Sequence, residues 1–297
     1  MTRQSNFSII EAPSILGLKP TGVDCLPDAL RKAGFYEKLA ADFEARVAAL
    51  EFNPQRDPQT HLLNAEGIAT YSRSLSQVVE PVVRSGRFPI VLGGDCSILL
   101  GNLLALRRLG RYGLFFLDGH SDFCQPEADA FGEVASMDLA IATGRGPDIV
   151  SNINGLKPLV RDEDTVVFGD RDGEATEGYG DHNVRSTRIY TRNLEEVRQT
   201  GVKQAALEGL DWLMQKPLDG FWIHLDADVL DDAIMPAVDY RMPDGLSFAE
   251  LIDVLQVLMA SPKAIGINIT IFNPKLDSDG TITQAFTQAL VMGLTAH

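Results

Sequence analysis

Cysteine is scarce in this sequence, and long apolar runs are missing. The 297 residues contain three cysteines, Cys25, Cys96 and Cys124, which are too few and too scattered for a disulfide framework. No apolar run approaches the roughly 18 residues that a transmembrane helix requires. A basic segment followed by an apolar one, the pattern of a secretory signal, is absent after Met1. We therefore expect a cytoplasmic protein that does not enter a membrane.

Basic residues are in the minority. The chain has 26 Lys and Arg against 41 Asp and Glu, which gives a net charge of −15 and a pI near 4.7. This balance argues against a nucleic-acid partner, which requires a basic surface, and against binding to anionic membranes. The hydrophobic content of 45% is ordinary for a globular protein. No repeat, low-complexity tract or linker interrupts the chain, so we expect one domain over residues 1–297.

Short apolar runs alternate with amphipathic segments along the chain. The runs that predict buried strands cover residues 8–10, 88–92, 112–117, 165–168, 221–225 and 264–271. The segments that predict helices cover a stretch beginning at Pro27 and residues 65–86, 97–109, 137–142, 202–214, 248–260 and 281–294. Strands that alternate with helices predict a parallel sheet with helices on both faces.

Polar side chains follow three of the predicted strands. The run 112–117 leads into D-G-H-S-D, with Asp118, His120 and Asp122 at every second position. If these residues continue extended, all three side chains point to one face. The run 221–225 leads into Asp226 and Asp228, and 88–92 leads into G-G-D-C-S at 93–97. In open α/β sheets, ligands bind at the carboxyl ends of the strands.

This combination of side chains predicts a metal site. Several carboxylates would be costly to bury together without a cation between them. Carboxylates with one imidazole suit hard or borderline divalent ions such as manganese. Two ions roughly 3.5–4 Å apart would suit hydrolysis by a bridging hydroxide. The alternative to a metal site is a set of ordinary polar loops that follow the strands.

Taken together, these motifs resemble those of the ureohydrolase (arginase/agmatinase) family. G-G-D-C-S at 93–97 is similar to G-G-D-H-S, D-G-H-S-D at 118–122 to D-A-H-x-D, and D-A-D at 226–228 to D-x-D. The opening T-G-V-D-C-L-P-D-A-L-R-K-A-G-F also resembles that of the family. The resemblance implies a three-layer α/β/α sandwich with a mostly parallel sheet of about eight strands. It also implies a two-manganese centre, a small-molecule substrate and a homo-oligomer, a trimer or hexamer.

The resemblance also assigns roles to individual residues. Asp118 and Asp226 resemble the carboxylates that bridge the two metals. Position 96 and Asp122 would complete one metal's ligands, and His120 and Asp228 the other's. The bridging hydroxide would attack a guanidinium-type carbon. The implied catalytic residues are Asp122 and Asp228, which can orient the hydroxide and pass its proton onward, together with His120.

Cys96 stands where the family has a histidine ligand. A thiolate is softer than an imidazole and favours zinc over manganese, and the thiol must lose its proton before it binds. Either Cys96 ligates, or it does not and one metal is weak or absent. A cysteine here is also similar to the Nω-hydroxy-arginine hydrolase branch of the family.

Two further positions depart from the family pattern. The loop that in relatives carries a proton-shuttling histidine has Ala135 and Ser136 at that place, and Glu133 or His182 could substitute. The family's final strand ends in E-V-N-P, with a glutamate that holds the substrate's guanidinium, whereas this chain has I-F-N-P with Ile271. Burying a guanidinium beside an isoleucine without another carboxylate is unfavourable, so a hydroxyguanidine, formimino or amide carbon fits better.

Other residues bear on the remote part of the substrate. Glu174 and Glu177, in R-D-G-E-A-T-E, resemble a stretch that faces the ammonium end of the substrate in arginase-like members; the alternative is a solvated acidic loop. Cys124 occupies a position where relatives often place an asparagine for the α-carboxylate. His224, at a strand end, is expected to make a hydrogen bond near the site.

These features lead to one main hypothesis and two alternatives. The main hypothesis is a metal-dependent hydrolase that cleaves a C–N bond of a linear amidine, that is, a guanidino, hydroxyguanidino or formimino compound. Its cofactor would be two Mn²⁺ per chain, with Zn²⁺ or another divalent ion possible because of Cys96. One alternative is a non-catalytic metal-binding member with a structural or regulatory role. The other is a single-zinc deacetylase-like hydrolase on a related fold.

Overall fold

The structure is a computed structural model that describes residues 6–173 and 183–295. Its centre is one sheet of eight strands in the order β2-β1-β3-β8-β7-β4-β5-β6, and every neighbouring pair is parallel. The strands are β1 (Phe7–Ala12), β2 (Asp42–Arg46), β3 (Phe88–Gly93), β4 (Tyr112–Leu117), β5 (Thr165–Phe168), β6 (Tyr190–Arg192), β7 (Gly220–Asp226) and β8 (Ala264–Thr270).

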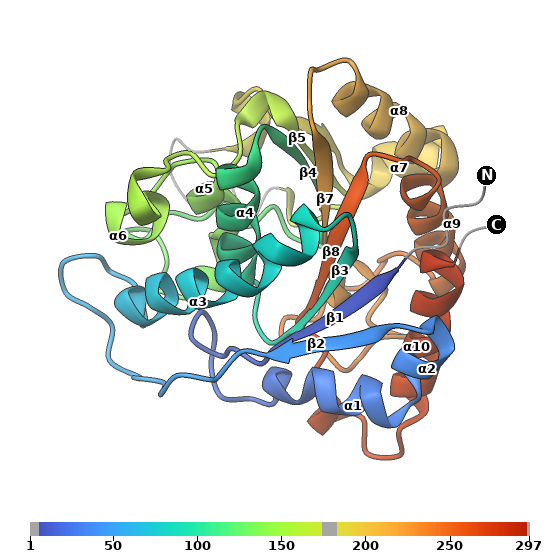
Figure 1. Cartoon of the computed structure of the whole chain (residues 1–297), viewed down its shortest axis with the longest axis horizontal. Coiled ribbons are helices and arrows are strands. Elements are labelled where there is room, and N and C mark those ends of the chain that lie inside the picture. Colours follow the sequence, from blue (N-terminus) through green and yellow to red (C-terminus); the bar gives the residue numbers. More distant parts are fainter. Residues whose placement is uncertain (1–5, 174–182, 296–297) are drawn as a thin grey trace.

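Helices cover both faces of the sheet (Figure 1). One face is covered by α3 (Ala65–Arg84), α4 (Ile98–Leu109), α5 (Asp138–Ala142) and α6 (Asp148–Ser151). The other is covered by α1 (Leu26–Lys32), α2 (Phe35–Leu39), α7 (Leu194–Thr200), α8 (Val202–Met214), α9 (Phe248–Met259) and α10 (Thr281–Leu294). The fold is therefore the expected three-layer α/β/α sandwich. No described helix is long and apolar enough to cross a membrane.

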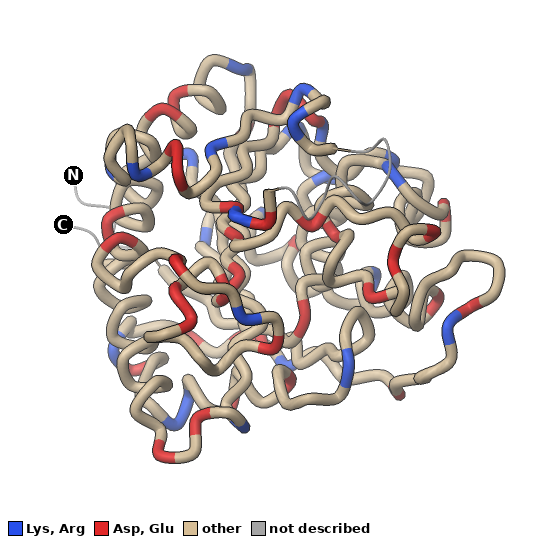
Figure 2. The backbone as a smooth tube through the Cα atoms, turned by 180° about the vertical axis from the view of Figure 1, so that it is seen from behind, with Lys and Arg blue, Asp and Glu red and all other residues tan. Residues whose placement is uncertain are grey.

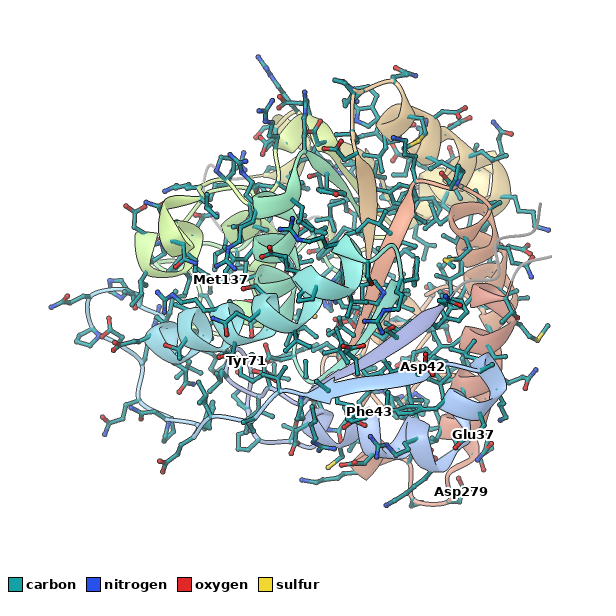
Figure 3. All side chains as sticks on the ribbon, viewed as in Figure 1. Glu37, Asp42, Phe43, Tyr71, Met137 and Asp279 are labelled. Carbon is teal, nitrogen blue, oxygen red and sulfur yellow. The ribbon has the colours of Figure 1, made fainter. Side chains whose placement is uncertain are left out.

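The central strands are apolar on both sides because both faces of the sheet are covered. In β4, Leu114 and Phe116 lie in the core beneath α3 and α4, whereas Phe115 and Leu117 lie in the core on the other face. Burial differs between the interior of the protein and the edge of the sheet. Met137 is fully buried, while Phe43 on the edge strand β2 is half exposed (Figure 3).

Most of the predicted elements are present, and the exceptions are short or irregular. The strands β2 and β6 were not expected from the sequence. The helical stretch beginning at Pro27 is two helices, because Gly34 has a φ of +79° and breaks it. The helix expected over 65–86 ends at Arg84, and Pro81 lies in its last turn.

The sheet brings the three polar motifs to one edge. β3, β8, β7 and β4 are neighbours in the middle of the sheet, and the motifs follow β3, β4 and β7. Leu117 in β4 pairs with Leu225 in β7, so Asp118 and Asp226 leave the sheet side by side. Residues 118–122 do not remain extended, so the condition under which all three side chains would point to one face is not met. The chain bends after Asp118, and Asp122 has a φ of +43°.

Candidate metal centre and substrate pocket

The turn after β3 is shaped by close backbone packing. A Cβ on Gly94 would lie 1.6 Å from the carbonyl oxygen of Ser14, so only glycine fits there. The Asp95 carboxylate accepts hydrogen bonds from the Ser14 hydroxyl (3.2 Å) and from the backbone N–H groups of Gly17 (3.1 Å) and Ser97 (2.8 Å). These contacts hold the turn that carries Cys96, whose side chain is buried.

Residues that can ligate a metal meet in three overlapping groups at this edge of the sheet. Within each group, one ligand atom per residue lies within 4.8 Å of all the others. The groups are Cys96, Asp118, His224 and Asp226; Cys96, Asp122 and Asp138; and Asp118, His120 and Asp228. The bend after β4 therefore sends His120 towards Asp228 and Asp122 towards Cys96. This is the same division that the family resemblance implies, and ligation itself remains a prediction.

His120 is held by two aspartates. Its Nδ1 lies 2.9 Å from Asp228 Oδ2 and 3.7 Å from Asp118 Oδ1. Burial would lower the pKa of His120, but the carboxylates of Asp228 and Asp118 outweigh it and raise the pKa well above its usual value. Burial would likewise raise the pKa of Asp118, but the imidazoles of His120 and His224 lower it to about 2.

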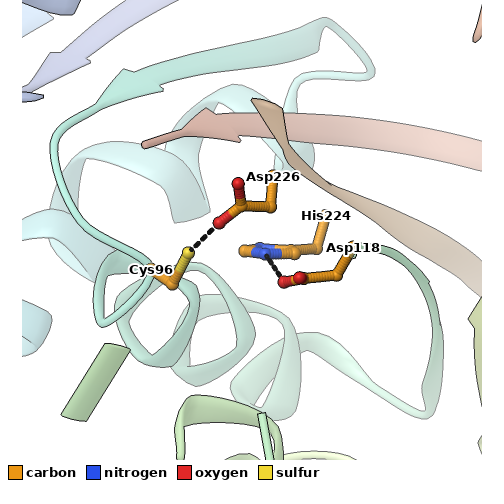
Figure 4. Close-up of side chains that lie close together, drawn as sticks. All are labelled: Cys96, Asp118, His224 and Asp226. Atoms are coloured by element: carbon orange, nitrogen blue, oxygen red, sulfur yellow. Dashed lines mark hydrogen bonds and ion pairs between the residues drawn. The ribbon is translucent and has the colours of Figure 1, made fainter. Parts of the chain in front are cut away.

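Cys96 contacts both β7 and β8. Its thiol donates to Asp226 Oδ2 at 2.8 Å (Figure 4). It also lies 3.2 Å from the hydroxyl of Thr270. Burial, followed by the negative charge of Asp226, raises the pKa of this thiol well above its ordinary value. Without a cation Cys96 is therefore a neutral thiol, and it must lose its proton if it is to bind one.

His224 is oriented by a chain of hydrogen bonds. The indole N–H of Trp222 can only donate, and it donates to Asn268 Oδ1 (2.7 Å). The amide nitrogen of Asn268 therefore donates to His224 Nδ1 (2.8 Å), which confirms the expected hydrogen bond. The proton of neutral His224 is then on Nε2, 3.7 Å from Asp118 Oδ2 (Figure 4). A protonated Nε2 cannot ligate a metal, so in this tautomer His224 lies beside Asp118 as a neighbour of the site and not as a ligand.

Asp138 is a member of the site that the sequence did not reveal. It is the first residue of α5. One of its carboxylate oxygens lies within 4.8 Å of the Cys96 sulfur and of one Asp122 oxygen. The sequence shows it only as a single carboxylate within M-D-L-A-I-A. The signal that could have identified it is this isolation, because a lone charge in an otherwise apolar helix requires a partner.

The electrostatics of the cluster fit the binding of cations. Burial first, and then repulsion between neighbouring carboxylates, raises the pKa values of Asp122 and Asp226 well above the ordinary range. Among the described residues, no Lys or Arg forms an ion pair with Asp122, Asp138 or Asp226, and Asp118 Oδ2 has no hydrogen-bond partner. A buried group of carboxylates without positive side chains is a site that divalent cations stabilise.

A cavity of about 440 Å³ opens onto this cluster. His120, Asp122, Asp226 and Asp228 lie at its base, where the strands end. Its remaining lining mixes apolar, small polar and acidic side chains with one arginine: Leu18, Ser121, Phe123, Cys124, Asp129, Phe131, Glu133, Ala135, Ser136, Arg171, Asp172, Tyr240, Met242 and Ile271. The residues expected to be catalytic therefore face a space large enough for a small molecule.

The structure places the other predicted substrate residues as follows. Ile271 lines the cavity and has a φ of +65°, which is strained for a β-branched residue. Cys124 is also part of the lining, and burial raises the pKa of its thiol to about 12. Glu174 and Glu177 lie outside the described residues, and so does His182.

The position of the family's shuttle histidine contains no imidazole. Ala135 and Ser136 line the cavity there. Glu133, which could substitute, already accepts a hydrogen bond from Tyr240 (2.5 Å) and forms an ion pair with Lys19 (2.7 Å). Glu133 is therefore part of the cavity wall and is not a free proton acceptor.

Arg171 and Asp172 differ in what they contact. The Arg171 guanidinium donates to backbone carbonyls at two places in the loop after β7, among them Asp228 (2.7 Å) and Met242 (3.0 Å). It therefore fixes the loop. Within residues 6–173 and 183–295, the Asp172 carboxylate accepts hydrogen bonds only from the N–H and hydroxyl of Ser121 (both 3.0 Å), and it faces the cavity. It can therefore contact the positive end of a bound molecule.

Comparison with known proteins finds relatives over the whole chain. The profile of the Arginase family matches residues 5–296. Arginase of Staphylococcus aureus (strain COL) is 30% identical over 289 residues, which cover 94% of this chain and 93% of that relative. The solved arginase of Bacillus caldovelox superposes with a TM-score of 0.88 at 28% identity and covers 99% of both chains. Formimidoylglutamase of Bacillus subtilis subsp. subtilis str. 168 (18% identity, TM-score 0.74, 98% and 86% coverage) has the same fold.

Proposed function

Because this chain belongs to the arginase family, we propose that it is a hydrolase that cleaves a C–N bond of a linear amidine. The observation that carries the proposal is the buried group of aspartates, with His120 and Cys96, at the base of a cavity of about 440 Å³. The compounds that fit are guanidino, hydroxyguanidino and formimino compounds.

In this proposal two divalent ions bind at the ends of β3, β4 and β7. Asp118 and Asp226 lie between the two groups of ligands; Cys96 and Asp122 hold one ion, and His120 and Asp228 hold the other. Coordination to such ions would lower the pKa of water from about 15.7 towards 7 and so provide hydroxide at neutral pH. Manganese suits the carboxylates and imidazole, and Cys96 favours zinc or a similar ion on its side.

The chain's own residues position the reactants and move the proton. His120 Nδ1 lies 2.9 Å from Asp228 Oδ2, so the two side chains are close enough to share one ion. Asp228 and Asp122 both line the cavity and can accept the proton of the attacking water. In the reaction one C–N bond breaks, water adds to the amidine carbon, and the proton passes to the departing nitrogen. Burial of both aspartates limits competition from bulk water.

The cavity lining supports a particular kind of substrate. Ile271 offers no charge to a guanidinium, which favours a less basic reacting group, such as a hydroxyguanidine or a formimino group, over an ordinary guanidinium. Asp172 faces the cavity without a positive partner among the described residues. It supports a substrate whose remote end carries an amine.

The test is an assay of metal-loaded protein. Metal-free protein is loaded with Mn²⁺ or Zn²⁺, its metal content is measured, and it is incubated with guanidino, hydroxyguanidino and formimino compounds, each with and without a remote amine. We expect two ions per chain and release of urea, hydroxyurea or formamide, with a preference for the less basic compounds that carry an amine.

Matched variants distinguish chemistry in the cluster from a general effect of buried charge. Asp226→Asn should lower kcat/KM by more than the roughly 10–100-fold that is typical of groups behind the ligands. Asp170→Asn, which changes a buried aspartate outside the three groups, should leave it within about twofold. Protein that binds two ions but is inert on all compounds would favour a non-catalytic role, and protein that binds no metal would contradict the proposed centre.

A further inference from the structure

Asp138 is a fully buried carboxylate beside Asp122, and it lacks a well-formed hydrogen bond from a donor group of the described residues. It lies at the start of α5, is 0% exposed, and neither of its oxygens has a hydrogen-bond partner among the described residues. A buried ionised group without a partner is strongly unfavourable. Asp138 can therefore be ionised in this position only if a cation satisfies it.

The surroundings of Asp138 do not otherwise explain its presence. Its neighbours Met137 and Leu139 are fully buried and lie in the core beneath the sheet. An apolar residue would suit this position better if the position served packing alone. No Lys, Arg or His in the described part of the chain forms an ion pair with Asp138.

What does face Asp138 is the Cys96 side of the cluster. One of its oxygens, the Cys96 sulfur and one Asp122 oxygen all lie within 4.8 Å of one another. A proton shared between Asp122 and Asp138 would account for the two carboxylates lying together. It would not account for the Cys96 sulfur, which comes from the end of a different strand and lies within the same 4.8 Å. Sulfur and oxygen ligands lie about 2.3 Å and about 2.0–2.2 Å from zinc, so small side-chain adjustments would let the three atoms share one ion.

We propose that Asp138 is an additional metal ligand, which with Cys96 and Asp122 forms a thiolate–carboxylate site for a borderline divalent ion such as Zn²⁺ or Co²⁺. The inference rests on the proposed function, because it concerns one half of the same centre. It makes the two halves chemically different: one has a sulfur and carboxylates, and the other has the imidazole of His120 with Asp118 and Asp228. Borderline ions favour the first, and manganese favours the second.

The test is a cobalt titration of metal-free full-length protein, because cobalt bound to a thiolate has a characteristic near-ultraviolet absorption. The wild type should bind two Co²⁺ per chain and show this absorption. Asp138→Asn keeps the shape of the side chain and removes its charge. This variant should bind one Co²⁺ with the affinity of the wild type and the other at least tenfold more weakly. At the same cobalt concentration, it should show much less of the thiolate absorption than the wild type.

The matched control is Asp170→Asn, which removes another buried carboxylate near the same edge of the sheet. At pH 7, metal-free Asp170→Asn should unfold at a higher temperature than the wild type, because it removes a buried charge. The rise in unfolding temperature on adding Co²⁺ should shrink only for Asp138→Asn. A purely structural Asp138 would alter the metal-free protein and leave this rise unchanged, and that result would overturn the inference.

A measurement on the wild type makes the test independent of how well the variants fold. Anomalous diffraction from crystals soaked in Co²⁺ or Zn²⁺ should place an ion about 2.0–2.2 Å from an Asp138 oxygen. Two bound ions that both lie beyond bonding distance of Asp138 would overturn this inference and leave the proposed function intact. A wild type that binds no ion would overturn both.

Discussion

Asp170 shows how a buried carboxylate behaves when the protein itself supplies a cation. It follows β5, is 2% exposed, and lies 3.4 Å from the guanidinium of Arg185. Burial raises its pKa to about 6, and Arg185 only partly opposes this shift. Asp138 has no such cation among the described residues, which is why the two aspartates are expected to respond differently to metal.

The raised pKa of Asp170 predicts a pH dependence of stability. The folded protein holds the proton up to about pH 6, whereas the unfolded chain releases it near pH 3.8. Ionisation of Asp170 therefore disfavours the folded state. The contribution of Asp170 to the free energy of unfolding falls as pH rises from about 4 to 6. Asp170→Asn should remove this fall and be more stable than the wild type at pH 7, by on the order of 2–3 kcal/mol.

Urea unfolding of both proteins at pH 4 and pH 7 checks this prediction. Other carboxylates titrate in the same range, so the quantity to compare is the difference between wild type and variant, which should be near zero at pH 4 and largest at pH 7. Arg185→Gln is the matched change of opposite sign and should destabilise the protein more at pH 7 than at pH 4. An equal difference at both pH values would contradict the proposed cause.

At the level of single residues, sequence reasoning could predict the candidate site wherever a motif was present. Asp118, His120 and Asp122 share one motif, and Asp226 and Asp228 share another, so their meeting followed from the predicted parallel sheet. Asp138 could not be predicted in this way, because it reaches the cluster from a helix 16 residues beyond Asp122 and belongs to neither motif. Backbone strain at Ile271 is also invisible in the sequence, because isoleucine rarely adopts a positive φ.

The loop after β7 depends on Arg171 and on a glycine in the β4 motif. Arg171 donates five hydrogen bonds to carbonyls of residues 228–230 and 242–243. A Cβ on Gly119 would lie 2.4 Å from Arg171 Nη1 and 2.8 Å from the carbonyl oxygen of Asp228. The glycine in D-G-H-S-D is therefore required where the two segments approach each other, and this gives a physical reason for its departure from D-A-H-x-D.

Gly119→Ala should therefore destabilise the protein by about 1–3 kcal/mol, as overpacking typically does. Part of this cost comes from the guanidinium, so Arg171→Gln should relieve part of it. We expect a coupling of about 0.5–3 kcal/mol between the two positions, measured by urea unfolding of the wild type, both single variants and the double variant.

Gly67→Ala is the matched control for this cycle. A Cβ on Gly67, in α3, meets only ordinary contacts of 3.6 Å or more, and alanine suits a helix better than glycine by roughly 0.5–1 kcal/mol. This variant should be as stable as the wild type or more so. Additive effects of Gly119→Ala and Arg171→Gln would contradict the contact proposed between them.

At the level of elements, the sequence predicted those strands that are buried on both sides. The six inner strands are mainly apolar because both of their sides are buried. β2 and β6 escaped prediction because they lie at the two edges of the sheet. The side chains of β2 are almost all exposed, and β6 has only three residues. A short or solvated edge strand has no apolar run to mark it, and pairing with its neighbour decides its conformation.

The charge of the whole molecule adds to the charge at the site. The net charge is −15, and Asp and Glu are spread along the chain rather than gathered in one segment (Figure 2). The cavity adds Asp129 and Asp172 above the buried cluster, and two divalent ions would neutralise much of the charge below them. A positively charged substrate is therefore attracted first by the molecule as a whole and then by the wall of the cavity.

This attraction predicts a salt effect that depends on the charge of the substrate. For the amidine that the assay identifies, kcat/KM of the form with a remote amine should fall several-fold, and by roughly tenfold at most, as NaCl rises from about 0.01 to about 0.5 M, because the ions screen the attraction. The analogue without the amine should change by less than about twofold over the same range. Asp172→Asn should reduce the preference for the amine at every salt concentration, because its carboxylate acts at contact distance. The matched control is Asp253→Asn, which removes a charge on the outer surface of α9. This control variant should have the same preference for the amine as the wild type. Equal salt sensitivity of the two substrates would mean that the field of the protein does not guide the substrate and that the acidic wall has another role.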